Sequence, residues 1–136
     1  MSMSPLAQRN LEVVQTMAAN GYIGNYDVVA PFIADNYTCN LPEGLAYGGT
    51  YHGLEGYKQV FAHISDYFSE VDFSEVEFFP DDHKVAILLR LRATLRNSGR
   101  KIDMPLAEFW TLENGKVTNI TAFYYDTKTI HQLDEG

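Results

Sequence analysis

The sequence predicts an α+β domain in which helices come first and an antiparallel sheet follows. Apolar residues recur at helical spacing in the first half of the chain, up to about Phe68. From Val71 onward, apolar and polar residues alternate, which is typical of half-buried strands. Helical segments followed by consecutive strands are the order expected of an α+β fold.

Length and composition favour one folded domain. The chain has 136 residues, 46% of them hydrophobic, which is enough for a single core, so residues 1–136 are expected to form one domain. The net charge of −8 argues against nucleic acid and anionic membranes as partners. No apolar stretch reaches 18 residues, and Cys39 is the single cysteine, so we expect a cytoplasmic protein without an intrachain disulfide.

Helix signals mark three segments in the first half of the chain. Ser4 is a favourable N-cap and Pro5 suits the first helical position, so the first helix should begin at Pro5. In chain order, we expect helices at about 5–20, 27–34 and 54–68, with a short strand at 37–41 and a Gly- and Tyr-rich loop at 43–53 before the third helix. The residues of the third helix that should face the sheet are Tyr57, Val60, Phe61, Ile64, Tyr67 and Phe68.

Alternating strands occupy the rest of the chain. They are expected at 71–79, 84–96, 102–112 and 116–126, with no further helix. Helices that lean on a strongly bent sheet leave a conical pocket between the two layers. The sequence therefore predicts an internal pocket beside a curved sheet.

The strand at 102–112 places one acid on an otherwise apolar face. Because side chains alternate along a strand, this face holds Ile102, Met104, Leu106, Glu108, Trp110 and Leu112. A buried carboxylate is costly unless it is paired or protonated, and desolvation raises its pKa, which makes Glu108 a candidate general base or acid. Two plainer explanations stay open: a half-buried glutamate at a rim, or one neutralised by Arg90 or Arg92.

Several short motifs, in this order and spacing, resemble those of a known family. They are Phe32-Ile33-Ala34-Asp35-Asn36, Gly49-Thr50-Tyr51-His52-Gly53-Leu54-Glu55-Gly56, Phe109-Trp110-Thr111-Leu112-Glu113-Asn114-Gly115-Lys116-Val117 and Tyr124-Tyr125-Asp126-Thr127. Together they span about Leu6 to Ile130. The chain resembles the nuclear transport factor 2-like superfamily and, within it, the branch of SnoaL-like polyketide cyclases and ketosteroid isomerases.

The resemblance implies a cone-shaped, cystatin-like fold, in which a curved antiparallel sheet wraps around N-terminal helices and encloses a pocket. It also implies a homodimer and cofactor-free chemistry. Glu108 falls where SnoaL-like cyclases keep an acidic general base. The place of the isomerase base reads Cys39-Asn40-Leu41-Pro42, without a carboxylate, and the isomerase tyrosine corresponds to about Met17. Steroid isomerisation by the usual acid–base pair is therefore not expected.

Two further residues are candidates for catalysis beside Glu108. Tyr124 matches the pocket-lining face of the isomerases and could donate a hydrogen bond to an oxyanion, or it could be only an aromatic wall residue. Asn40 could bind a carbonyl if it points inward, but a shift of one residue would turn it outward and Cys39 and Leu41 inward. The expected wall residues are Met17, Tyr57, Leu91, Met104 and Trp110. The four histidines show no metal-ligand spacing, so no metal site is expected.

These residues favour a protein that binds an apolar small molecule with a carbonyl group. Glu108 would move a proton next to that carbonyl, as in an isomerisation or an aldol-type cyclisation. The alternative is a non-catalytic ligand-binding or dimerisation module on the same fold. In either case we expect a homodimer through the outer sheet face, which carries Arg90, Arg92, Thr94, Phe109 and Thr111.

Overall fold

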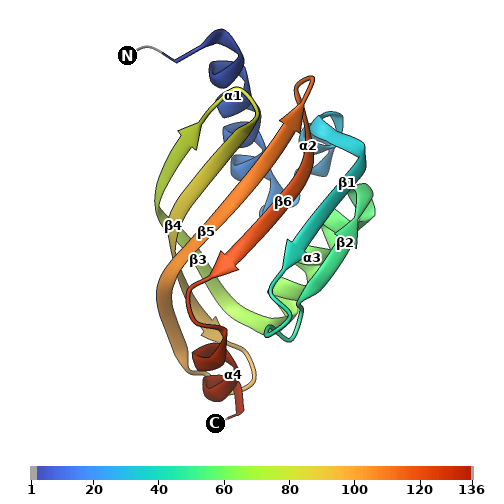
Figure 1. Ribbon diagram of the computed structural model, residues 1–136. Helices are drawn as coiled ribbons and strands as arrows, with labels where there is room; N and C mark the ends of the chain where they lie inside the picture. The colour runs from blue at the N-terminus through green and yellow to red at the C-terminus, as the bar shows by residue number, and fades with distance from the viewer. Residues whose placement is uncertain (1–2, 136) are drawn as a thin grey trace.

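The computed structural model describes residues 3–135, and it shows a curved sheet wrapped around helices (Figure 1). The elements in chain order are α1 (Pro5–Gly21), α2 (Tyr26–Val29), η1 (Ala30–Phe32), β1 (Ile33–Leu41), β2 (Gly49–His52), α3 (Gly53–Tyr67), β3 (Phe68–Pro80), β4 (Lys84–Leu95), β5 (Lys101–Glu113), β6 (Lys116–Tyr124) and α4 (Thr127–Glu135). The predicted α+β class is confirmed.

The six strands form one sheet in the order β2-β1-β6-β5-β4-β3, and the sheet does not close into a barrel. Four of the five neighbouring pairs are antiparallel, but β1 runs parallel to β6. The expectation of an antiparallel sheet is therefore wrong at this pair. Hairpin turns force consecutive strands to be antiparallel, whereas β1 and β6 are joined by a long crossover that permits either direction.

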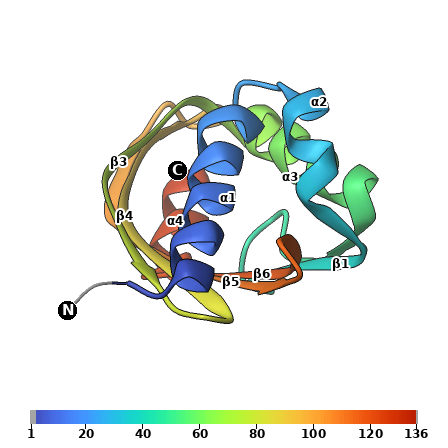
Figure 2. The ribbon, with the colours of Figure 1, turned by 90° about the horizontal axis from the view of Figure 1, so that it is seen from above.

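Helices α1 and α3 lie against the concave side of the sheet (Figure 2). The Ser4 hydroxyl accepts a hydrogen bond from the Ala7 amide at 3.0 Å, so the predicted N-cap of α1 is confirmed. On α3, Tyr57, Val60 and Ile64 are buried, as expected from the helical spacing. The space between these two helices and the sheet is where the pocket forms.

The second helix is shorter than expected. The α-helical part ends at Val29, and the chain tightens into the 3₁₀ turn η1 before β1 begins at Ile33. Pro31 explains the change, because it has no amide hydrogen with which to continue an α-helix. The strand that follows is therefore four residues longer at its start than the expected segment 37–41.

A fourth helix, α4, follows the last strand, so the expectation of no further helix is wrong. Asp126 caps it: one carboxylate oxygen accepts from the Thr129 amide at 3.0 Å and the other from the Thr129 hydroxyl at 2.6 Å. Ile130 is 1% exposed and anchors the helix to the core. Within residues 3–135, none of the helices has the length and apolar character that a membrane crossing needs.

Candidate functional site

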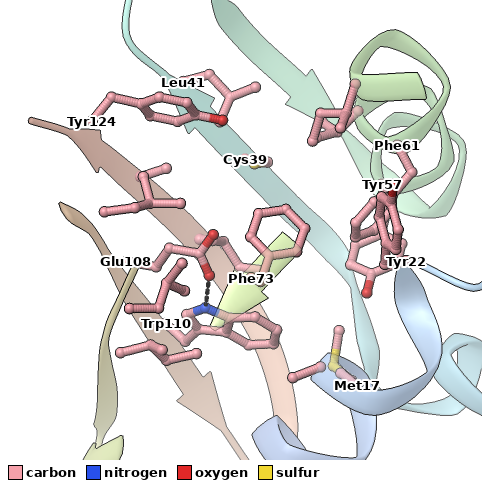
Figure 3. A pocket seen from close by; sticks show the side chains of 18 of the residues that line it. Met17, Tyr22, Cys39, Leu41, Tyr57, Phe61, Phe73, Glu108, Trp110 and Tyr124 are labelled. Carbon is pink, nitrogen blue, oxygen red and sulfur yellow. Dashed lines mark hydrogen bonds between the residues drawn. The ribbon is translucent and has the colours of Figure 1, made fainter. Parts of the chain in front are cut away.

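A pocket lies between the concave face of the sheet and helices α1 and α3 (Figure 3). Its volume is about 210 Å³. Strand residues such as Leu41 and Tyr124 form one wall, and Met17 of α1 and Tyr57 of α3 face them. Among the described residues that line the pocket there is no Lys, Arg or His. The site is therefore apolar, with a few polar groups that carry no positive charge.

Glu108 lies on β5 and turns its carboxyl group into this pocket (Figure 3). Its neighbours across the sheet are Ile87 on β4 and Ala122 on β6, which are both apolar. Burial raises the pKa of Glu108 above its usual value, and a hydrogen bond from Trp110 offsets part of this effect. The upward direction expected from the sequence is confirmed.

Trp110 holds the carboxylate in place. It lies two residues after Glu108 on the same strand face, and its indole Nε1 donates a hydrogen bond of 2.9 Å to Glu108 Oε1. The other carboxylate oxygen, Oε2, makes no hydrogen bond within the described part of the chain. One oxygen of Glu108 is thus positioned by the protein, and the second is available to a ligand.

The arginines do not reach Glu108. Arg90 forms an ion pair with Asp103, with 2.6 Å between Nε and Oδ1, and Arg92 forms one with Glu75 at 2.7 Å. All four residues lie on the convex side of the sheet, away from the pocket. The alternative that an arginine neutralises Glu108 is therefore wrong, because alternation along β4 turns Arg90 and Arg92 to the opposite face.

Tyr124 lines the pocket from β6 and shares a hydrogen bond with Tyr47, with 3.0 Å between the two hydroxyl oxygens. Burial raises the pKa of Tyr124 well above its usual value, so its hydroxyl stays protonated. Tyr47 lies in the loop between β1 and β2, and its backbone carbonyl accepts a hydrogen bond from the Tyr51 hydroxyl at 2.7 Å. Sequence reasoning missed Tyr47, since nothing in the spacing shows that this loop folds back on β6.

Three more weakly acidic groups surround Glu108. Tyr37 and Cys39 reach the pocket from β1, and Tyr57 reaches it from α3. Each has a raised pKa, mainly because it is buried and in part because of the nearby Glu108; that of the Cys39 thiol rises to about 12. A thiol with such a pKa is not a nucleophile at neutral pH. Alternation on β1 could have identified Tyr37 and Cys39, had the register been known.

Asn40 does not reach the pocket. Cys39 and Leu41 line it, so Asn40 points to the opposite face, where its amide donates to Thr121 Oγ1 at 3.3 Å and its carbonyl accepts from Thr50 at 3.1 Å. The expected role of Asn40 in binding a carbonyl is wrong. The cause is the register of β1, which the sequence alone left open.

The expected wall residues divide into two groups. Met17, Tyr57 and Trp110 line the pocket. Leu91 and Met104 are not among its described lining residues; they lie opposite each other on β4 and β5 and are buried in the core. The two strands are longer than the pocket, so residues on the correct face but farther along it pack against other core residues.

Sequence reasoning did not place the aromatic residues Tyr22, Phe61 and Phe73 in the pocket. Tyr22, at the end of α1, is 39% exposed and lines the pocket. Its ring makes edge-to-face contacts with Phe61 of α3, at 6.1 Å between centroids, and with Phe73 of β3, at 5.6 Å. These rings come from three different elements and meet only in the folded chain.

A curved, open sheet that encloses an apolar pocket with its helices defines a class of small pocket proteins. A family model for the SnoaL-like domain matches residues 14–120, so the chain belongs to the SnoaL-like domain family, within the nuclear transport factor 2-like superfamily. No curated protein sequence matches the chain.

Solved structures show the same fold at low sequence identity. A nuclear transport factor 2-like protein of unknown function from Burkholderia pseudomallei is 21% identical, with a TM-score of 0.82 over 94% of this chain and 98% of that one. A protein from Jannaschia, named as a candidate SnoaL-like polyketide cyclase, is 18% identical, with a TM-score of 0.85 over 100% and 99%. A protein from Catenulispora acidiphila with a ketosteroid isomerase-like fold, in complex with trimethylamine, is 18% identical, with a TM-score of 0.69 over 83% and 85%.

Proposed function

We propose that this protein binds a small apolar carbonyl compound in the pocket and that Glu108 transfers a proton at the carbon next to the carbonyl. The observation that carries the proposal is the state of Glu108: a desolvated carboxyl group, oriented by Trp110 through one oxygen only, in a pocket with apolar walls. A raised pKa brings a carboxylate closer to the value at which it both accepts and returns protons near neutral pH.

The proposed chemistry uses two groups of the chain. The Glu108 carboxylate removes a proton from the α-carbon, and the electron pair of that C–H bond moves onto the carbonyl oxygen to form an enolate. When the Tyr47 hydroxyl donates to Tyr124, the proton of Tyr124 is free to point to that oxygen. If a C=C bond is conjugated with the enolate, returning the proton from Glu108 to its far carbon completes an isomerisation. If the enolate carbon instead attacks a second carbonyl, a C–C bond forms, and the proton on Glu108 passes to the new alkoxide to complete an aldol-type cyclisation.

The size of the cavity supports a small ligand. Its volume of about 210 Å³ lies below the range of roughly 300–1,000 Å³ that is usual for pockets that hold drug-sized ligands. The segment that corresponds to the usual ketosteroid isomerase base, Cys39-Asn40-Leu41-Pro42, has no carboxylate, and the pKa of Cys39, about 12, makes its thiol unsuitable as a base at neutral pH. Both features favour a compact ketone over a steroid as the substrate.

Deuterium exchange into a ketone tests this proposal. We expect the protein to accelerate exchange of the α-protons of 2-tetralone in D₂O, followed by proton NMR. Glu108→Gln should lower the acceleration by at least about 100-fold, the smaller end of what a positioned acid or base contributes. Glu113→Gln, on an exposed residue at the end of the same strand, is the control that changes net charge equally. Exchange that continues unchanged in Glu108→Gln would rule out Glu108 as the proton carrier.

Ligand binding without catalysis is the second candidate function. Within the described chain, the partner that orients Glu108 is a tryptophan N–H, and the remaining polar groups nearby are tyrosine hydroxyls and a thiol that stay protonated. The Catenulispora acidiphila protein is in complex with trimethylamine, a molecule without a carbonyl group. A protein that binds 2-tetralone but leaves its exchange rate unchanged would support this second function.

We also propose a homodimer that forms through the convex face of the sheet. Leu88, Phe109 and Phe123 are 43–55% exposed there, although each is large and apolar. Leu88 and Phe123 flank Ala107 across neighbouring strands, and the rings of Phe109 and Phe123 contact each other at 5.7 Å between centroids. A contiguous exposed apolar patch of this kind is typical of an interaction surface.

We also propose that the protein is cytoplasmic. Its single cysteine, Cys39, is free and buried, which suits a reducing cytoplasm because no disulfide is needed for stability. Fractionation of cells that express the tagged protein tests this expectation. Recovery in a secreted or membrane fraction would contradict it.

A further inference from the structure

Within residues 3–135, Glu108 has no positively charged partner. Within the described residues, no basic side chain lines the pocket. On the neighbouring strand β4, Arg90 and Arg92 form ion pairs with Asp103 and Glu75 on the opposite face of the sheet. Glu108 is half-buried, and a carboxyl group desolvated in this way favours a proton or a cation as its counter-charge. Below the pKa of Glu108 a proton fills this role in the free pocket, and a positively charged ligand could take its place.

The surroundings of the carboxyl group suit such a ligand. Aromatic rings reach the pocket from four elements or their ends: Tyr22 after α1, Tyr57 and Phe61 on α3, Phe73 on β3 and Trp110 on β5 (Figure 3). The electron-rich faces of aromatic rings attract alkylammonium groups, most strongly when these groups are removed from water. Aromatic cages are the arrangement by which proteins recognise alkylated ammonium ions, and here the aromatic rings share one pocket with the carboxyl group of Glu108.

The groups that face Glu108 add no competing positive charge. They are Tyr37 and Cys39 from β1, Tyr57 from α3 and Tyr124 from β6, and all four have raised pKa values. The cross-strand neighbour of Glu108 on β4 is Ile87, and the residues of α1 that line the pocket are Met17 and Ala18; none of these titrates. Glu108 is therefore the only group of this set that changes its charge in the ordinary pH range.

We propose that the pocket is a binding site for an organic cation with a compact apolar body, whose ammonium head lies against the free oxygen of Glu108 and among the aromatic rings. Below the pKa of Glu108, binding exchanges one positive charge for another: the cation enters, and the proton of Glu108 leaves for the solvent. The net charge of −8 on the chain raises the local concentration of cations and so favours their approach. This activity uses the pocket of the proposed function but requires neither a carbonyl group nor catalysis.

The exchange gives binding a defined pH dependence. Below the pKa of Glu108 in the free protein, the proton must be displaced, so the affinity for a cation falls as the pH falls. Above that pKa the carboxylate is already ionised, and the affinity reaches a plateau. A neutral ligand of the same shape shows no such gain with rising pH, because it cannot replace the proton as a counter-charge.

A matched pair of probes tests this inference. Phenyltrimethylammonium carries a permanent charge, and tert-butylbenzene has the same shape with a carbon in place of the nitrogen. Trp110 is the single tryptophan of the chain and lies in the pocket, so its fluorescence reports occupancy directly. At pH 8 we expect phenyltrimethylammonium to bind at least tenfold more tightly than tert-butylbenzene, and its Kd to rise at least tenfold between pH 8 and the acid side of the Glu108 titration.

Variants and calorimetry complete the experiment. Glu108→Gln should reduce the preference for the cation to less than threefold and remove its pH dependence, while Glu113→Gln, which changes net charge equally, should retain both. Calorimetry of the unaltered protein in buffers of different ionisation enthalpy should show proton release on cation binding at acidic pH, even if Glu108→Gln folds poorly. Equal binding of the two probes, or a cation affinity independent of pH, would overturn the inference. Deuterium exchange of 2-tetralone reports separately on the proposed proton transfer, so either idea can fail alone.

Discussion

At the scale of single residues, Glu108 and Trp110 show how a strand orients a desolvated carboxyl group in the pocket. Burial raises the pKa of Glu108, and the N–H of Trp110 lowers it by a smaller amount, so the net direction is upward. The donor comes from the same strand face, two residues away, which gives it a fixed position. Tyr47 supports Tyr124 in a comparable way, although it comes from a distant loop.

The raised pKa of Glu108 predicts how stability depends on pH. Because the pKa is higher in the folded than in the unfolded chain, Glu108 favours folding below the unfolded pKa of about 4.3, and this advantage is lost as the pH rises through the folded pKa. Glu108→Gln lacks the ionisation, so its free energy of unfolding relative to the unaltered protein should increase across this window. The gain should approach about 1.4 kcal/mol for each pH unit that separates the two pKa values.

Urea denaturation followed by circular dichroism at several pH values from 4 to 8 measures this effect. Glu113→Gln serves as the control, since Glu113 is exposed and should show no such trend. A Glu108→Gln variant that becomes less stable relative to the unaltered protein as the pH rises would mean that a cation of the protein pairs with Glu108.

At the scale of elements, α3 connects the core to the pocket. Tyr57, Val60 and Ile64 are buried along one stripe, as its helical spacing predicts. Phe61 was also expected in that stripe, yet it is half-buried because it lines the pocket. At Gly56 a side chain would meet the backbone of Tyr51 at 2.9 Å, so the absence of a side chain there lets α3 lie close to β2.

Ile64→Ala tests the packing of α3. Ile64 is 6% exposed, and its loss should leave a cavity that lowers the free energy of unfolding by about 2–5 kcal/mol. Gln59→Ala, on the exposed face of the same helix, should change it by less than about 0.5 kcal/mol. Thermal and urea denaturation measure both. Equal losses for the two variants would show that the burial of this helix is assigned to the wrong face.

At the scale of the whole molecule, the two proposed functions lie on opposite faces of the sheet. The concave face and the helices enclose the pocket, while the convex face carries ion pairs and the apolar patch of Leu88, Phe109 and Phe123. Because the pocket and the proposed dimer contact lie on opposite faces of the sheet, we expect that assembly and ligand binding can be altered independently.

Phe123→Glu tests the dimer. The unaltered protein should have about twice the chain mass of 15.4 kDa in light scattering at micromolar concentration, and it should bury about 800 Å² per subunit. A buried negative charge on each side of the two-fold contact should convert Phe123→Glu to a monomer. Gln59→Glu, on the exposed side of α3 and away from this face, should remain a dimer. A monomeric unaltered protein at this concentration would contradict the proposal.

The sequence by itself determined the α+β class, the cap of α1 at Ser4, the buried stripe of α3 and the inward face of β5 with Glu108. Each of these depends on local periodicity or capping, which neighbouring residues encode. Only the tertiary structure decided the parallel pairing of β1 with β6, the outward direction of Asn40 and the contact between Tyr47 and Tyr124. These features depend on strand register and on contacts between residues that lie 77 or more positions apart in the sequence, and no local pattern specifies such contacts.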